Sequence, residues 1–356
     1  MGSERTASWW HREGERLLCD LCPHRCSLPA GATGLCGARA EQDGKLIATS
    51  YGVVCVQSLD PIEKKPIFHY RPGTLVYSLG TYGCNLDCAN CQNFELVKAS
   101  RQPLPSGVMS PQDVVTEAER IGAQGIAWTF NEPVTWYEFV LDTARAAEAK
   151  GLYTMVNTNG YILPAPAEEL FGHVQVVNID VKGFTEKFYR TICGAGLQDV
   201  LNTCILAKDR GVHVELTYLL IPGLNDSAEE IGQFTRWVVE HMGADTPIFF
   251  FRFQPFYRLS HLPEQSMEKM NEARTIARRE GARYVYFGGV AEDSNQNTLC
   301  PRCSAVVVER RIVRASGKVC FKEREVSRFC PTVSDVHIHL KDGRCPRCGE
   351  IIPIVL

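Results

Sequence analysis

The sequence predicts an α/β fold, a partial (β/α) TIM-type barrel with a small cysteine-rich module at each end. The first observation is that strand-like and helix-like segments alternate from Tyr77 to Gly288, a pattern typical of a parallel sheet. The second is that about seven such strands are expected, one short of a closed eight-stranded barrel. The third is that a group of four cysteines lies on each side of this region.

The expected strands are short runs of β-branched, aromatic and other apolar residues. They are Leu75 to Gly80, Gly125 to Phe130, Tyr153 to Val156, Val174 to Ile179, Val212 to Leu220, Ile248 to Phe253 and Tyr284 to Phe287. The expected helices between them are Pro111 to Ile121, Trp136 to Lys150, Val200 to Arg210, Ser227 to Met242 and Met267 to Glu280. Helix starts such as Ser110-Pro111 and helix ends at glycine, as at Gly211, support these boundaries.

The composition is that of a globular protein with a full core. The chain has 356 residues, of which 45% are hydrophobic, and its net charge is -3. We therefore expect no nucleic-acid partner and no membrane partner. The first residues form no apolar signal core, so a cytoplasmic location is expected. The predicted domains are an N-terminal metal-binding segment (1–73), the barrel (74–290) and a C-terminal module (291–356) that resembles a zinc ribbon or rubredoxin.

Sixteen cysteines are present, and without a secretory signal they are expected to be reduced thiols and metal ligands. Most of them fall into three clusters, which are Cys19, Cys22, Cys26 and Cys36; Cys84, Cys88 and Cys91; and Cys300, Cys303, Cys345 and Cys348. The others, Cys55, Cys193, Cys204, Cys320 and Cys330, are expected mostly to be small buried residues. Cys193 is also a candidate reactive thiol near the mouth of the barrel.

The middle cluster predicts the catalytic centre. Cys84, Cys88 and Cys91 have C-x3-C-x2-C spacing and directly follow the first barrel strand. A [4Fe-4S] cluster normally takes four thiolates, so a loop with three leaves one iron open to a chelating molecule such as S-adenosylmethionine. One electron from the cluster would then split a carbon–sulfur bond and produce a 5′-deoxyadenosyl radical. A zinc site or free thiols are the alternatives.

Polar or proline-containing turns at successive strand ends predict the cofactor pocket, since parallel barrels place their chemistry there. The expected cofactor-binding residues share this position or flank the cysteines, and they are Tyr82, Asn90, Asn131, Glu132, Asn157, Asn159, Asp180, Lys182, Ile221 and Pro222. Lys182 would neutralise the cofactor carboxylate, and Ile221-Pro222 would form an apolar wall for adenine. The alternatives are ordinary turns and, for Asp180 and Lys182, a structural ion pair.

The two outer clusters predict further metal sites. Cys300 with Cys303 and Cys345 with Cys348 form two C-P-x-C knuckles, which present four thiolates as structural zinc prefers. The N-terminal cluster, C-x2-C-x3-C-x9-C, also offers four thiolates with no open position. Structural zinc and a second iron–sulfur cluster remain nearly balanced there, with a slight preference for zinc.

These motifs together resemble the radical S-adenosylmethionine proteins related to pyruvate formate-lyase activating enzyme, and most closely the radical protein of the AmmeMemoRadiSam system. The resemblance covers most of the chain. It depends on Asp60 to Pro66, Gly83-Cys84-Asn85, Cys91-Gln92-Asn93, Thr129 to Pro133, Asp180 to Lys182, Leu220 to Asp226 and Asn297 to Pro301. Asn157 stands where the activating enzyme has an aspartate that helps to form a cation site, which puts such a site in doubt.

The resemblance implies a radical enzyme that abstracts hydrogen from a substrate, with a protein or peptide as the expected substrate class. It also implies an electron donor such as flavodoxin or ferredoxin, and Memo-like and AMMECR-like companion proteins. The alternative is a metal-rich binding or electron-transfer scaffold without radical turnover. Methylation or methylthiolation ranks lower, because no pair of acceptor cysteines is evident near the barrel mouth.

Overall fold

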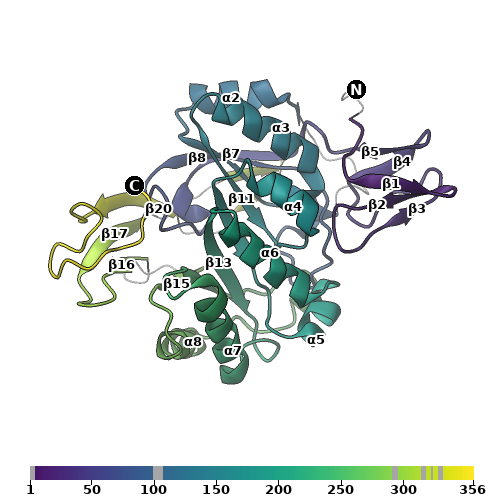
Figure 1. Ribbon diagram of the computed structural model, residues 1–356. Coiled ribbons are helices and arrows are strands. Elements are labelled where there is room, and N and C mark those ends of the chain that lie inside the picture. Colours follow the sequence, from purple (N-terminus) through teal and green to yellow (C-terminus); the bar gives the residue numbers. More distant parts are fainter. Residues whose placement is uncertain (1–4, 99–106, 291–295, 314–317, 322–323, 328–331) are drawn as a thin grey trace.

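A mostly parallel eight-stranded sheet forms the centre of the computed structural model, which describes residues 5–98, 107–290, 296–313, 318–321, 324–327 and 332–356 (Figure 1). The strand order is β15-β14-β13-β12-β11-β10-β8-β7. The parallel strands are β8 (Leu75–Gly80), β10 (Gly125–Trp128), β11 (Tyr153–Thr158), β12 (Val176–Asp180), β13 (His213–Leu220), β14 (Ile248–Arg252) and β15 (Val285–Gly288). The prediction of seven parallel strands is therefore confirmed.

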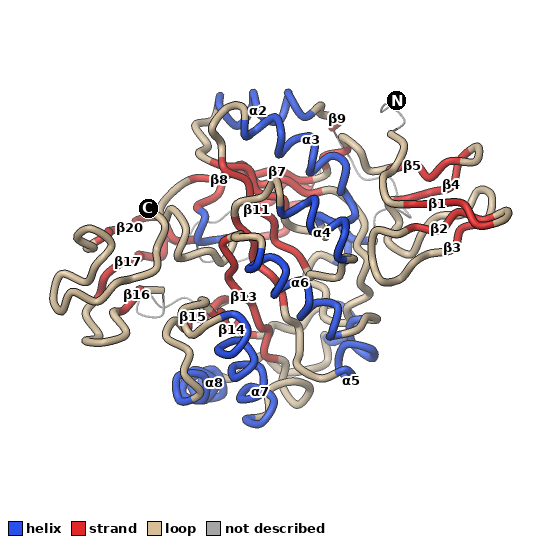
Figure 2. Tube along the Cα trace, in the orientation of Figure 1, coloured by secondary structure: helices blue, strands red, loops and turns tan. Residues whose placement is uncertain are grey.

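Helices cover the outer face of this sheet (Figure 2). The longer ones are α2 (Pro111–Arg120), α3 (Tyr137–Glu148), α4 (Pro164–Phe171), α6 (Leu197–Asp209), α7 (Ala228–Trp237) and α8 (Met267–Arg279). The shorter ones are η1 (Ile62–Lys64), α1 (Phe94–Val97), η3 (Pro133–Trp136), α5 (Glu186–Phe188), η4 (Tyr189–Cys193), η5 (Val238–Met242) and η6 (Tyr257–Leu259). The Ser110 side chain caps α2 in a full capping box, as its sequence indicates. The sequence pattern did not predict α4, which has two prolines in its first turn.

The edge strand β7 (Val56–Pro61) is antiparallel to β8, and it was not expected in the barrel sheet. The chain that follows it turns onto the inner face, where Ile62 and Ile67 pack against Val76 and Met155. Asp60 binds the ammonium groups of the next turn, with Lys64 and Lys65 each at 2.7 Å. Side-chain amides of β11 and β12 donate to backbone oxygens of this segment. Residues 60–70 therefore fill the inner face of the sheet.

The N-terminal module consists of short strands beside the barrel (Figure 1). They are β1 (Trp10–Glu13), β2 (Arg16–Cys19), β3 (Ser27–Leu28), β4 (Arg39–Gln42), β5 (Lys45–Ala48) and β6 (Val53–Val54), and β6 pairs with β9 (Gly107–Val108). It contacts the carboxyl edge of the sheet, where the Cys84 amide donates to the Cys36 carbonyl at 3.2 Å. The Leu163 amide, beyond the end of β11, also donates to the Leu21 carbonyl at 3.0 Å.

The C-terminal module lies on the other side of the barrel, against the amino edge of the sheet (Figure 1). Its strands are β16 (Thr298–Leu299), β17 (Val306–Val313), β18 (Lys318–Phe321), β19 (Arg324–Ser327) and β20 (Thr332–Ile338). Val307 and Ile352 join Phe68, Phe249 and Tyr284 in one buried cluster. The two modules therefore occupy opposite edges of the same sheet.

The three predicted domains are connected closely. The boundary at residue 73 falls between β7 and β8, which are hydrogen-bonded neighbours. The boundary near residue 290 precedes β17, whose Arg310 guanidinium is fully buried and donates to the Phe68 carbonyl. The division into three domains stays a prediction, and these contacts show that both boundaries are crossed by hydrogen bonds.

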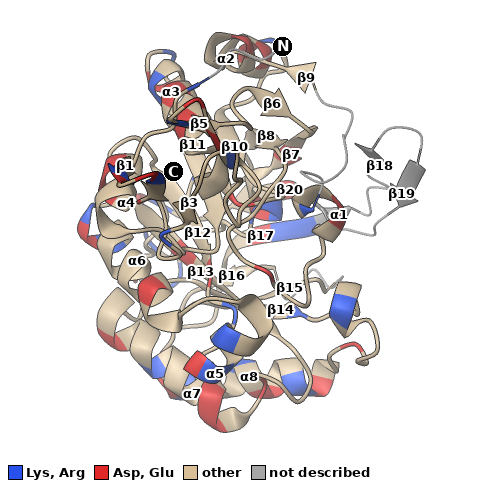
Figure 3. Ribbon diagram, turned by 90° about the vertical axis from the view of Figure 1, so that its right-hand side faces the viewer, with Lys and Arg blue, Asp and Glu red and all other residues tan. Residues whose placement is uncertain are grey.

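Two of the scattered cysteines lie in the main hydrophobic core. Cys193 and Cys204 are fully buried, as expected for small apolar residues, and Cys55 is partly buried. The Cys320 side chain and Cys330 lie outside what the structure describes. Charged residues of both signs are interspersed along the outer helices (Figure 3). Within the described residues, no helix has the length and apolar character needed to cross a membrane.

Candidate active site

The loop between β8 and α1 carries Cys84, Cys88 and Cys91, and the next strand exit holds it in place. Asn131 follows β10, and its Oδ1 accepts a hydrogen bond from the Thr81 amide at 3.0 Å. Its Nδ2 donates to the carbonyls of Tyr82 at 3.3 Å and Gly83 at 3.1 Å. Asn131 thus fixes the backbone that leads into Cys84.

The exit of β11 contacts the first cysteine. The Asn159 Nδ2 lies 3.7 Å from the Cys84 Sγ and 2.8 Å from the Asn85 Oδ1. A hydrogen bond to a ligand sulfur is one of the ways in which a protein tunes an iron–sulfur cluster. Asn159 therefore lies where it can both position Cys84 and act on a cluster bound there.

Glu132 connects the exits of β10 and β11. Its carboxylate accepts hydrogen bonds from the Val134 amide at 3.0 Å, the Thr158 hydroxyl at 2.7 Å and the Asn159 amide at 2.8 Å. Burial raises the pKa of Glu132 to about 7, although these three bonds favour the charged form. All three donors belong to the protein itself, so Glu132 holds the exits of β10 and β11 together.

The exit of β12 lies next to the second cysteine. Lys182 Nζ and Asp180 Oδ2 form an ion pair at 3.0 Å. A hydrogen bond with the Cys193 thiol lowers the pKa of Cys88, and the Lys182 ammonium lowers it further against the opposing effect of burial. Lys182 is therefore paired with Asp180, the structural alternative that the sequence left open, and its role toward a cofactor carboxylate stays a prediction.

The segment η4 supports the cysteine loop by backbone bonds. The Asp87 amide donates to the Cys193 carbonyl at 2.9 Å, and the Ala89 amide donates to the Ile192 carbonyl at 2.8 Å. On the exposed side, Arg258 pairs with Asp87 at 2.9 Å. The sequence reading did not assign Arg258 or Asn85 to the site, because their partners are distant along the chain and no spacing signals such contacts.

Other predicted cofactor residues lie farther from the thiols or have partners within the protein. Asn157 faces the inside of the sheet, where its Nδ2 donates to the Lys65 carbonyl at 3.1 Å. The Tyr82 hydroxyl donates to Thr49 at 3.2 Å. Ile221 is fully buried, whereas Pro222 is partly exposed. The Asn90 Oδ1 is buried without a hydrogen-bond partner among the described residues, which leaves it available to a ligand.

The three thiols fit the open-iron cluster that their spacing predicts. They belong to one loop, they are partly exposed, and polar groups from the exits of three strands surround them. Phe130, at the exit of β10, has φ +71, a left-handed conformation that is uncommon for an aromatic residue and is often found at functional sites. A [4Fe-4S] cluster held by Cys84, Cys88 and Cys91 would supply the electron for reductive cleavage of its bound cofactor.

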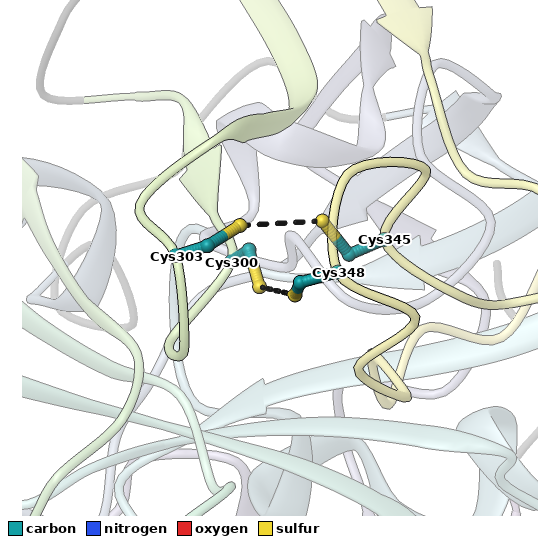
Figure 4. A group of neighbouring side chains, drawn as sticks. All are labelled: Cys300, Cys303, Cys345 and Cys348. Carbon is teal, nitrogen blue, oxygen red and sulfur yellow. Dashed lines mark hydrogen bonds between the residues drawn. The ribbon is translucent and has the colours of Figure 1, made fainter.

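The four C-terminal cysteines form a compact group (Figure 4). The Cys300 and Cys348 sulfurs are 3.5 Å apart, and the Cys303 and Cys345 sulfurs are 3.6 Å apart. All four ligand atoms lie within 4.8 Å of one another. Tetrahedral zinc with bonds of about 2.3 Å separates its sulfurs by about 3.8 Å, so this group has the size of a single-ion site.

The four N-terminal cysteines line one cavity, which they share with a residue of the cysteine loop. The cavity wall includes Cys19, Cys22, Cys26 and Cys36 together with Leu21, Leu28, Arg39 and Asn85. Among the residues that the structure describes, the C-terminal four are the only group of three or more ligand side chains within 4.8 Å of one another. The N-terminal sulfurs are therefore more widely spaced.

Comparison with known proteins places these features in a family. The Radical SAM superfamily model matches residues 78–235. The uncharacterized protein MJ0808 of Methanocaldococcus jannaschii is 38% identical over 344 residues, covering 97% of each chain. Pyruvate formate-lyase 1-activating enzyme of Escherichia coli is 26% identical over 163 residues, which are 43% of this chain and 65% of that enzyme.

A solved structure aligns more distantly. It is Streptococcus suis SuiB bound to S-adenosylmethionine, at 14% identity and a TM-score of 0.47, covering 61% of this chain and 52% of that chain.

Proposed function

Because the chain belongs to the radical SAM superfamily and is an enzyme of that class, we propose that Cys84, Cys88 and Cys91 bind the [4Fe-4S] cluster of this class. The bound S-adenosylmethionine is cleaved reductively to a 5′-deoxyadenosyl radical, which abstracts hydrogen from a substrate. The observation that carries this proposal is the convergence of Asn131 and Asn159, from two strand exits, on a loop with three thiols.

The residues around this loop have separate roles in the proposal. Lys182 neutralises the cofactor carboxylate, and Asn90 offers its unpaired buried oxygen to the cofactor. Asn131, Glu132 and Asn159 hold the pocket wall through the bonds described above. Ile221 and Pro222 form the adenine wall. Asp180 orients Lys182, and Tyr82 closes the side next to Cys84. Asn157 has a structural role, since its side-chain amide donates to the Lys65 carbonyl in the segment that packs on the inner face of the sheet.

The substrate that we propose is a protein or peptide. Similarity to pyruvate formate-lyase activating enzyme supports this class, because that name denotes an enzyme acting on another enzyme. We assign the chain to the AmmeMemoRadiSam system, with Memo-like and AMMECR-like companions and a flavodoxin or ferredoxin as electron donor. A metal-rich scaffold without radical turnover is the alternative that the first experiment excludes.

That experiment measures 5′-deoxyadenosine formed by the reduced, reconstituted protein with S-adenosylmethionine. The wild-type chain is expected to form it, and the triple variant Cys84→Ala/Cys88→Ala/Cys91→Ala is not. Product formation by the triple variant, or none by a wild-type chain that carries its cluster, would overturn the proposal.

The role of Lys182 is tested by calorimetric binding of S-adenosylmethionine. Lys182→Ala should weaken binding by about tenfold or more, since a hydrogen bond to a charged group contributes about 1.5–3 kcal/mol. Lys187→Ala is the matched control, because Lys187 is exposed on the neighbouring α5. Equal affinities of both variants and wild type would return Lys182 to a purely structural role.

A further inference from the structure

The N-terminal cysteines occupy a site that differs in size from the C-terminal zinc-type group. Two sulfurs bound to one zinc ion lie at most about 4.6 Å apart, because each Zn–S bond is about 2.3 Å. Two pairs of the C-terminal sulfurs, at 3.5 and 3.6 Å, fall within this limit, and all four lie within 4.8 Å of one another, but no three of Cys19, Cys22, Cys26 and Cys36 form such a group in the described structure. All four nevertheless line the same cavity. Four thiols around a space wider than one ion fit a cluster, whose thiolates bind separate irons.

The same distance criterion applies to the radical loop, which is the loop between β8 and α1 that carries Cys84, Cys88 and Cys91. Cys84, Cys88 and Cys91 also form no compact group within the described chain, and in the radical SAM family such cysteines hold a cluster. Within the described residues, the N-terminal site and the radical loop thus have in common that neither forms the compact group seen at the C-terminal site.

The environment of the N-terminal cavity also suits a cluster. Apolar side chains, including Leu21 and Leu28, form part of its wall. The buried Arg39 guanidinium donates from Nη1 toward the Cys19 Sγ at 3.9 Å. Hydrogen bonds to ligand sulfurs and a low-dielectric surrounding are the protein's means of setting the potential of an iron–sulfur cluster.

The cavity and the radical loop are in direct contact. The Cys84 amide donates to the Cys36 carbonyl at 3.2 Å. A backbone hydrogen bond thus joins a proposed ligand residue of one site to a proposed ligand residue of the other. Asn85 lines the N-terminal cavity, and Asn159 contacts both Asn85 and the Cys84 sulfur. At Gly83, with φ +86, an added Cβ would lie 2.5 Å from the Cys36 oxygen. This close approach of the two loops requires glycine.

We propose that Cys19, Cys22, Cys26 and Cys36 bind a second [4Fe-4S] cluster, which passes single electrons to the cluster of the radical loop. In each transfer the N-terminal cluster is oxidised by one electron and the radical-loop cluster is reduced by one, with no bond or proton exchanged. A low-potential one-electron carrier protein restores the electron. Leu35, beside Cys36, is 73% exposed, so the N-terminal site lies close to solvent. The relay rests on the proposed radical function, whereas the binding of the second cluster does not.

The test begins with metal content. The full chain is reconstituted anaerobically with iron, sulfide and zinc, and the triple variant Cys84→Ala/Cys88→Ala/Cys91→Ala is treated in the same way. That variant should retain about four irons, about four sulfides and about one zinc per chain. No iron and about two zinc ions would overturn the proposal in favour of two zinc sites. Two irons with two sulfides per chain would indicate a [2Fe-2S] cluster and contradict the proposed [4Fe-4S] cluster.

Variants of the N-terminal site complete this experiment. Cys22→Ala/Cys26→Ala should lose about four irons while keeping about one zinc, and Cys204→Ala, which removes a buried cysteine outside all three clusters, should lose neither. The triple variant decides the case by itself if the N-terminal variant does not fold. Because it cannot cleave S-adenosylmethionine, its metal content is independent of the deoxyadenosine assay.

The contact between the two clusters is tested by electron paramagnetic resonance of the reduced proteins. The wild-type spectrum should show magnetic interaction and differ from the sum of the spectra of the two single-cluster variants. Gly83→Ala should weaken this interaction, whereas Gly211→Ala should not, because Gly211 has φ +76 but no atom within 4 Å of an added Cβ. A wild-type spectrum equal to the sum would overturn the relay.

Discussion

The two four-cysteine sites lie at opposite edges of one parallel sheet, and their surroundings differ accordingly. The N-terminal site touches the carboxyl edge, where the Cys84 loop and the polar strand exits lie. The C-terminal site packs on the amino edge through Val307, Ile352 and the aromatic cluster around Phe249. In (β/α) barrels the carboxyl edge carries the chemistry, and the amino edge contributes stability. Equal numbers of thiolates can therefore serve different purposes.

Each module is anchored to the barrel by a buried arginine. Arg39 pairs with Glu138 of α3 and points Nη1 toward Cys19. Arg310 pairs with Glu63 at 3.6 Å and donates to the Thr298 hydroxyl at 2.8 Å. The anchors are alike in burial and pairing, but only Arg39 contacts a cysteine sulfur in these bonds. This difference allows structural and redox roles to be separated.

The largest effect is expected at the C-terminal site. Cys345→Ala should release the zinc and make the segment after residue 295 sensitive to protease, because structural zinc contributes on the order of 10 kcal/mol to folding. The aromatic residues at the amino edge of the barrel should become exposed with it, since they share its core. Limited proteolysis and zinc analysis check this, with Cys204→Ala as the control. Retained zinc and an unchanged cleavage pattern would contradict a structural zinc site.

The two arginines are expected to give similar losses of stability and different spectra. Arg310→Met and Arg39→Met each leave a buried carboxylate unpaired, which costs about 3–5 kcal/mol. Urea unfolding measures this loss. Only Arg39→Met should shift the potential or spectrum of an N-terminal cluster, because its guanidinium reaches Cys19. Identical spectra for the two variants would mean that Arg39 is an anchor and nothing more.

A smaller effect is expected from acid at the amino edge. Burial lowers the pKa of His69 from its ordinary value of 6.5 to about 4. Its Nδ1 donates to the Pro353 carbonyl at 3.1 Å, because that oxygen can only accept, and its Nε2 accepts from the Tyr286 hydroxyl at 2.7 Å. A lowered pKa stabilises the folded state above pH 6.5, and this contribution is lost as the pH falls toward 4.

The loss should reach about 2–3 kcal/mol. His69→Gln keeps a donor and an acceptor without titrating, so it should flatten the dependence of the free energy of unfolding on pH between these values. The same slope in both proteins would show that other groups cause the acid sensitivity. A variant whose free energy of unfolding no longer varies over this range would support the assignment of the slope to His69.

The sequence by itself determined the parallel sheet and the grouping of the central thiols. Apolar strands that alternate with capped helices allow few topologies, since parallel strands need helical crossovers. The spacing of Cys84, Cys88 and Cys91 predicted that they share one short loop, because three residues within eight positions must lie close together whatever the surrounding fold. The paired knuckles at Cys300 and Cys345 predicted a four-thiolate group for the same local reason.

Only the tertiary structure decided how these local units combine. The sequence reading did not place β7 in the barrel sheet, because an antiparallel edge strand has no periodicity that distinguishes it from a strand of the N-terminal module. It did not pair Arg39 with Glu138 or place Cys36 against Cys84, since these contacts join residues far apart in the chain. Sulfur spacing also depends on the packing of whole loops. The N-terminal site, balanced between zinc and a cluster in sequence, is distinguished from the C-terminal site by this three-dimensional spacing.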